Sequence, residues 1–80
     1  MRQFLRPSAT IGQHIRWVRK CRKMTQDQVV SQLQLAGCDL SRGTYAKIEA
    51  GIRHISLEEL QALSRLLEVD YNTLLGYTKP

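Results

Sequence analysis

Helix-start signals recur along this chain of 80 residues, and they constrain its fold more than any other feature. Capping boxes span Thr25–Gln28 and Ser56–Glu59, and Thr10–Gln13 fits the same pattern. In each box a hydroxyl can accept a hydrogen bond from a free helix amide, while the glutamine or glutamate reaches back to the capping residue. Apolar residues then follow at every third or fourth position, the spacing of a helix with one buried face. No stretch alternates apolar and polar residues for long enough to predict a strand.

These signals predict an all-α fold of five helices, over residues 11–22, 26–36, 42–50, 57–67 and 71–75. Ser41 and Asp70 are the expected caps of the third and fifth helices. In the fourth helix, the expected buried stripe contains Leu57, Leu60, Leu63 and Leu67. We divide the chain into a flexible basic N-terminal arm (1–9), one helical domain (10–76) and a C-terminal tail (77–80).

Composition and chemistry exclude several classes of protein. No apolar run approaches the roughly 20 residues of a membrane span, and residues 1–7 lack the apolar core of a signal peptide. We therefore expect a cytoplasmic protein without a membrane partner, with Cys21 and Cys38 as reduced thiols. So short a chain leaves no room for a deep substrate pocket, and we expect no enzymatic activity.

Charge is distributed unevenly along the chain. Residues 1–57 carry ten basic and three acidic side chains, a balance of +7, whereas residues 58–80 carry two and four, a balance of −2. This polarity favours a polyanionic partner bound in a defined orientation. The alternative is a surface charge that serves only solubility.

The order of motifs is more specific than any one of them. Residues 11–19 (IGQHIRWVR), 24–26 (MTQ) and 41–51 (SRGTYAKIEAG) are followed by the leucine-rich segment 56–76. Together they resemble the helix-turn-helix domains of the Cro and phage-repressor type, also called the xenobiotic response element family. The resemblance covers residues 11–76 and implies a five-helix, lambda-repressor-like DNA-binding domain.

The resemblance implies that the third helix enters the major groove of double-stranded DNA, with its first residues facing base edges. The corresponding positions here are Arg42, Gly43, Thr44, Ala46 and Lys47. Arg42 can donate two parallel hydrogen bonds to a guanine edge. Gly43 either lets the backbone approach DNA closely or is merely a weak point in the helix.

Further residues are expected on the phosphate backbone, although each could instead be an ordinary solvated side chain. They are Lys23, Thr25, Gln26, Ser41, Arg53 and His54. The resemblance also implies a partly buried ion pair between Arg19 and Glu49. One departure concerns the segment from residue 31 to 40, which is about five residues longer than the family pattern. It puts the angle between the second and third helices in doubt, although Leu40 keeps the apolar position ahead of the Ser41 cap.

Cofactor and metal sites are not expected. His14, His54 and the two cysteines lack the spacing of zinc ligands. Trp17 is unusual, because it lies on the side of the first helix that the family keeps polar. Either Phe4 and Leu5 of the arm cover it, which we favour, or it belongs to a partner surface.

The sequence therefore predicts a bacterial or phage transcriptional regulator, a repressor, that binds specific sites on double-stranded DNA. A homodimer is expected, because a single such module buries only about 600–1,000 Å² on DNA. Its interface candidates are Leu66, Tyr71 and Tyr77. The alternative function is a protein-interaction module, such as an antitoxin that neutralises a partner and binds DNA secondarily.

Overall fold

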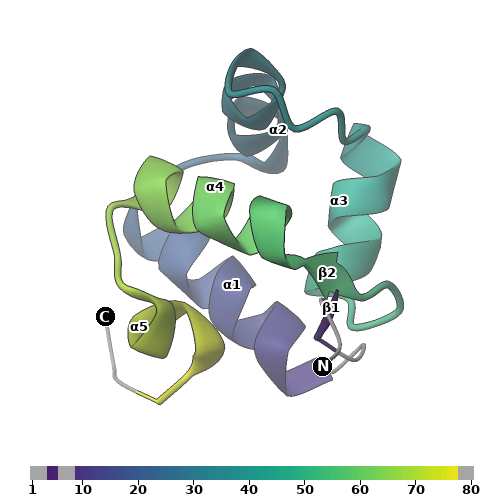
Figure 1. Ribbon diagram of the computed structural model, residues 1–80. Helices are drawn as coiled ribbons and strands as arrows, with labels where there is room; N and C mark the ends of the chain where they lie inside the picture. Colours follow the sequence, from purple (N-terminus) through teal and green to yellow (C-terminus); the bar gives the residue numbers. More distant parts are fainter. Residues whose placement is uncertain (1–3, 6–8, 78–80) are drawn as a thin grey trace.

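Four of the helices begin at the caps that the sequence predicts, as shown by the computed structural model, which describes residues 4–5 and 9–77. Thr25 and Ser56 form complete capping boxes, while Ser41 and Asp70 accept hydrogen bonds from the amides of Thr44 and Thr73. The described residues form the helices α1 (Ala9–Cys21), α2 (Gln26–Leu35), α3 (Arg42–Glu49), α4 (Leu57–Leu67) and α5 (Tyr71–Leu75), as Figure 1 shows. The all-α, five-helix prediction is confirmed.

Four predicted helix boundaries need correction. Helix α1 begins at Ala9 and ends at Cys21, so Thr10 lies inside its first turn and is not the predicted cap. Ala9 is a strong helix former, and it extends the helix past the capping signal. Helices α2 and α3 end one residue earlier than expected, because Ala36 and Ala50 are the half-helical capping residues.

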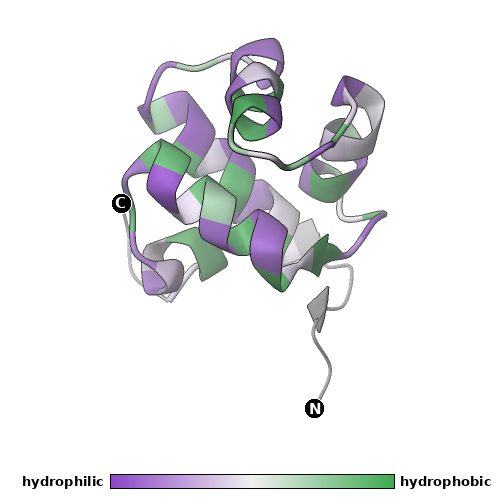
Figure 2. Ribbon diagram, turned by 45° about the horizontal axis from the view of Figure 1, so that its top comes forward, coloured by the Kyte–Doolittle hydropathy of each residue, from purple (hydrophilic) through white to green (hydrophobic). Residues whose placement is uncertain are grey.

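The core lies where all five helices meet. Figure 2 shows apolar and polar residues in bands around the helices, as expected of helices with one buried side. The buried apolar residues are Ile15, Val18, Val29, Val30, Leu33, Leu40, Tyr45, Ile48, Ile55, Leu60, Leu63, Leu67 and Leu74. Leu57 is the exception to the predicted α4 stripe, since its side chain is 48% exposed at the first position of the helix.

A short antiparallel ribbon adds an element that the sequence did not predict. Strand β1 (Phe4–Leu5) pairs with β2 (Ile55–Ser56), with Phe4 opposite Ser56 and Leu5 opposite Ile55. Two residues per strand are too few for an alternating pattern to be visible. The ribbon joins part of the expected N-terminal arm to the segment ahead of α4 (Figure 1).

Gly12 sets how closely α1 approaches the end of α3. A Cβ atom at this position would lie 2.3 Å from the carbonyl oxygen of Glu49 and 2.5 Å from that of Ile48. Both contacts are with backbone, which cannot turn aside as a side chain can. Gly12 is therefore part of what fixes the position of α3 on the rest of the domain.

The long segment between α2 and α3 keeps the expected register. After α2 ends, Gly37 turns the chain with a φ of +92°, and the Cys38 amide donates to the Leu33 carbonyl over 2.8 Å. Leu40 is then buried directly ahead of the Ser41 cap, as predicted. The additional length contributes the last turn of α2, where the Leu35 side chain is 81% exposed. No described helix is long and apolar enough to cross a membrane.

Candidate nucleic-acid interface

Helix α3 is held by a buried polar network at its C-terminal end. Arg19 of α1 donates from Nε to Oε2 of Glu49 over 2.7 Å and from Nη2 to Oε1 over 3.1 Å. Its remaining terminal nitrogen donates to the Met24 carbonyl over 2.8 Å. Gln26 of α2 adds a 3.0 Å hydrogen bond to Oε1 of Glu49. One carboxylate thus ties α1 and α2 to α3, and the structure brings together the expected ion-pair partners.

The network keeps both ions charged. The hydrogen bonds to Glu49 raise the pKa of Arg19. Burial alone would raise the pKa of Glu49, but the hydrogen bonds and the charge of Arg19 outweigh it, and the pKa is lowered from its ordinary value of 4.5. An ion pair with this many hydrogen bonds fixes geometry, because loss of either partner leaves a buried charge.

Tyr45 lies beneath this network. Its ring is fully buried, and its hydroxyl meets no hydrogen-bond partner among the described residues. Burial first, and then the neighbouring Glu49 carboxylate, raise the pKa of Tyr45, so its hydroxyl stays neutral at all ordinary pH values. Tyr45, which is part of α3, therefore fixes this helix on the core by packing.

The opposite face of α3 is turned away from the core. Arg42, Gly43 and Lys47 are exposed, whereas Thr44 and Ala46 are half-buried. The Arg42 and Lys47 side chains, with Gly43 beside Arg42, lie on the first two turns of a short helix, which is where a groove-binding helix meets bases. Nothing lies within 4 Å of the place where a Gly43 Cβ would stand.

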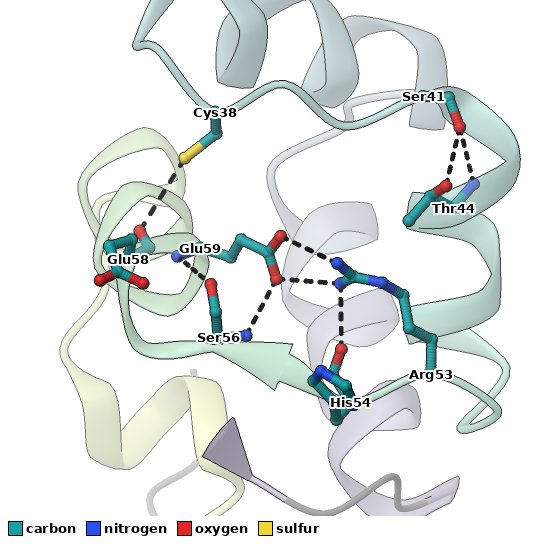
Figure 3. A network of polar contacts seen from close by, with 8 residues as sticks. All are labelled: Cys38, Ser41, Thr44, Arg53, His54, Ser56, Glu58 and Glu59. Atoms are coloured by element: carbon teal, nitrogen blue, oxygen red, sulfur yellow. Dashed lines mark hydrogen bonds and ion pairs between the residues drawn. The ribbon is translucent and has the colours of Figure 1, made fainter. Parts of the chain in front are cut away.

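Several of the expected contact residues already have partners within the protein. The Ser41 hydroxyl accepts from the Thr44 amide and donates to the Thr44 hydroxyl over 2.9 Å (Figure 3). Thr25 accepts from the Gln28 amide as the cap of α2. These hydroxyls therefore orient the starts of the two helices. Lys23 is exposed in the turn ahead of α2.

Arg53 lies in the loop after α3, where the carboxylate of Glu59 on α4 holds its side chain. It donates to both oxygens of Glu59 over 2.9 and 3.2 Å, and to the His54 carbonyl over 3.0 Å (Figure 3). Burial would raise the pKa of Glu59, but the hydrogen bonds of Arg53 and Ser56 lower it. The pair anchors the loop to the capping box of α4 and partly neutralises the charge that Arg53 could offer to phosphate. The His54 side chain is exposed.

Sequence reasoning missed two residues at this face. Asp27, the second residue of α2, forms an ion pair with Arg42, its Oδ1 lying 3.0 Å from Arg42 Nε. Arg16 lines the same surface cleft between α1, α2 and α3. The signal for Arg16 was its position three residues before Arg19, which places both on one side of α1. Asp27 had no such signal, because its partner is 15 residues away.

Other predicted sites are placed as follows. The described residues contain no group of three potential metal ligands, and both cysteines are free thiols. Trp17 is 44% exposed, and the side chains of Phe4 and Leu5, which were expected to cover it, lie outside the part of the chain that the structure describes. Leu66 is half-buried in a cleft between α2 and α4, while Tyr71 and Tyr77 are 46% and 81% exposed at the two ends of α5. The α2–α4 cleft therefore covers part of the Leu66 side chain.

Comparison with known proteins identifies the domain. A family model described as helix-turn-helix matches residues 15–74. The chain belongs to the helix-turn-helix family. Its resemblance to the Cro and phage-repressor type is confirmed, and it is a sequence-specific DNA-binding transcriptional regulator. The family is one of regulators, which points away from an enzyme.

A solved structure shares the fold of this helix-turn-helix protein. It is the restriction-modification controller protein C.AhdI from Aeromonas hydrophila, with a TM-score of 0.72 and 23% sequence identity, over 82% of this chain and 92% of that one. The likeness is one of fold. No curated protein matches the chain.

Proposed function

We propose that this regulator is a cytoplasmic repressor that binds a palindromic operator as a homodimer, with α3 in the major groove. The observation that carries the proposal is the Arg19–Glu49–Gln26 network. It holds α3 by its C-terminal end and leaves the opposite face, with Arg42 and Lys47, exposed. A polyanion would meet a rigid helix there, and rigidity lowers the entropic cost of binding.

Base readout falls to the exposed face of α3. Arg42 reads a guanine, Lys47 reaches a guanine or a phosphate, and Thr44 offers its methyl group or hydroxyl to a base or phosphate. Ala46 supplies an apolar contact suited to a thymine methyl group. Gly43 lets the helix backbone approach the groove closely.

The phosphate backbone is contacted on both sides of α3. Lys23 and the start of α2, with Thr25 and Gln26, lie ahead of it, and Arg53 and His54 follow it. Ser41 stands at the start of α3, where free amides favour phosphate. Gln26 acts mainly as a brace, since its amide already holds Glu49.

The dimer interface is assigned to Leu66, Tyr71 and Tyr77, on the side where the chain carries less positive charge. Aromatic side chains are enriched in interface cores. A two-fold axis there would place two α3 helices about 34 Å apart, one turn of DNA, to read a palindrome.

The test begins with selection of bound duplexes from a random pool. On the selected site we expect Arg42→Ala to lose affinity by about 1–3 kcal/mol and to relax one base position per half-site. Gln26→Ala should weaken binding to every duplex alike. Wild-type affinity in both variants would contradict the assignment of α3 as the recognition helix.

A second candidate function is supported by exposed aromatic residues. Trp17, Tyr71 and Tyr77 are all at least 44% exposed, which suits a surface for a partner protein such as a toxin. A salt titration of duplex binding separates the two functions. A steep fall of affinity with salt indicates DNA as the primary partner, and a flat response indicates the protein-interaction module.

A further inference from the structure

Asp27 places a negative charge on the face that the proposed function turns toward DNA. It lines the same cleft as Arg16 and Arg42, and its side chain is 74% exposed. A carboxylate at this position repels phosphate, so it opposes the general attraction between the basic half of the chain and DNA.

The ion pair of Asp27 with Arg42 gives little stability. The Arg42 side chain is 62% exposed, and ion pairs between two such exposed groups contribute little to folding. The pair does define where the Arg42 guanidinium lies in this structure. With Asp27 Oδ1 3.0 Å from Nε, the carboxylate occupies the inner edge of the guanidinium and holds a long side chain that would otherwise sample many rotamers.

The outer edge of the guanidinium carries the two terminal amino groups. These donate in parallel, which matches the O6 and N7 acceptors of guanine in the major groove. A carboxylate on the inner edge leaves the outer edge to face a base. It also fixes the plane of the group, on which two-point recognition depends.

We propose that Asp27 is a positioning residue for guanine readout: it holds Arg42 so that the terminal amino groups meet one guanine edge. The inference rests on the proposed function and adds a residue of α2 to the specificity of α3. Asp27 thereby lowers the affinity for DNA in general and increases discrimination at one base pair.

The experiment uses the selected operator and a copy in which 7-deazaguanine, which lacks the N7 acceptor, replaces the guanine read by Arg42. The measured quantity is the ratio of Kd values for the two duplexes. For the wild type we expect a ratio of about ten, a typical value for loss of half of a two-point contact. In Asp27→Asn the ratio should fall toward one, while affinity for a random duplex rises. Thermal melting checks that the variant folds.

Two controls make the result specific. Glu58→Gln removes one exposed carboxylate from the first turn of α4, so it changes net charge equally but should keep the wild-type ratio. In the Arg42→Ala background, Asp27→Asn should leave the ratio unchanged, because there is no guanidinium left to position.

The outcomes separate this inference from the proposed function. If no duplex is selected, or if Arg42→Ala keeps the wild-type ratio, the proposed readout by Arg42 is wrong, and the role of Asp27 falls with it. If Arg42→Ala abolishes the ratio but Asp27→Asn retains it, the readout stands and the positioning role of Asp27 is overturned. A ratio that rises in Asp27→Asn would also overturn it, since Asp27 would then be competing with guanine for Arg42.

Discussion

Glu49 accepts hydrogen bonds from two other helices, and the position of α3 depends on this one carboxylate. Its lowered pKa links it to the pH dependence of folding. In the unfolded chain the group titrates near its ordinary value of 4.5, and in the folded protein it titrates lower. The unfolded state therefore binds more protons between these two values, and stability falls as pH decreases through that window.

Glu49→Gln tests this link. At pH 7 we expect it to lower the free energy of unfolding by about 3–5 kcal/mol if burial is complete, because Arg19 loses its countercharge. As pH decreases below about 4.5, the wild type should lose stability more steeply than the variant. Urea titrations at pH 7, 5 and 3 measure both effects, with the exposed Glu58→Gln as control. Parallel pH profiles for wild type and Glu49→Gln would show that the ion pair does not carry the effect.

Substitution of Gly43 distinguishes two explanations for a glycine on the recognition face: close approach of the backbone to DNA, or a weak point in the helix. A Cβ at this position meets no other part of the described protein within 4 Å, so Gly43→Ala should raise the free energy of unfolding through helix propensity, by less than the roughly 1 kcal/mol of a helix interior because Gly43 lies in the first turn. If the backbone approaches the groove closely, the same methyl group must weaken operator binding. Melting and duplex titration of one variant measure both. Stabilisation with unchanged DNA affinity would mean that Gly43 is only a weak point in the helix.

At the scale of elements, the sequence predicted the helices whose starts it encodes locally. Thr25, Ser41, Ser56 and Asp70 cap as expected because the capping hydroxyl or carboxylate and its amide lie three residues apart. The start of α1 was wrong because the pattern at Thr10 competes with a helix-forming Ala9. The β1–β2 ribbon could not be predicted, since its pairing joins residues about 50 positions apart.

The site shows the same division between local and long-range information. Family resemblance supplied Arg19 and Glu49, which the structure brings together, and the exposed face of α3. It did not supply the contacts that redefine individual roles. Arg53 is paired with Glu59, and Arg42 with Asp27. Each of these depends on side-chain geometry that sequence spacing does not determine.

The last turn of α2 gives a prediction at this scale. Leu33 is fully buried, whereas Leu35, on the last turn of α2, is 81% exposed. Leu33→Ala should therefore cost about 2–5 kcal/mol of unfolding free energy, and Leu35→Ala about 0.5 kcal/mol or less. Chemical denaturation of the two variants compares them directly. A large loss in Leu35→Ala would show that the extra turn is part of the core or of an interface.

At the scale of the whole molecule, the basic and acidic ends of the chain have different expected duties. Residues 1–57 carry the recognition face, and residues 58–80 carry the proposed dimer contacts. Leu66 is partly covered by the α2–α4 cleft, so Tyr71 and Tyr77 offer most of the exposed surface. This shifts the proposed interface toward α5.

The double variant Leu66→Glu with Tyr71→Glu tests that interface. We expect it to weaken binding to the full operator far more than binding to a half-site, because introduced charges at an interface core oppose association of the two protomers. Sedimentation of the free protein measures the dimer itself. Equal losses on full and half-sites would move the interface elsewhere, with the half-exposed Trp17 on α1 as the next candidate.

The central claim, that α3 reads the major groove, is tested most directly by methylation interference on the selected operator. Dimethyl sulfate methylates guanine at N7 in the major groove and adenine at N3 in the minor groove, so one reaction probes both grooves. If α3 lies in the major groove, N7 methylation of guanines in each half-site blocks binding of the wild type. The Arg42→Ala variant should become insensitive to methylation at one of these guanines. Interference confined to adenine N3, or none in either groove, would contradict the placement of α3.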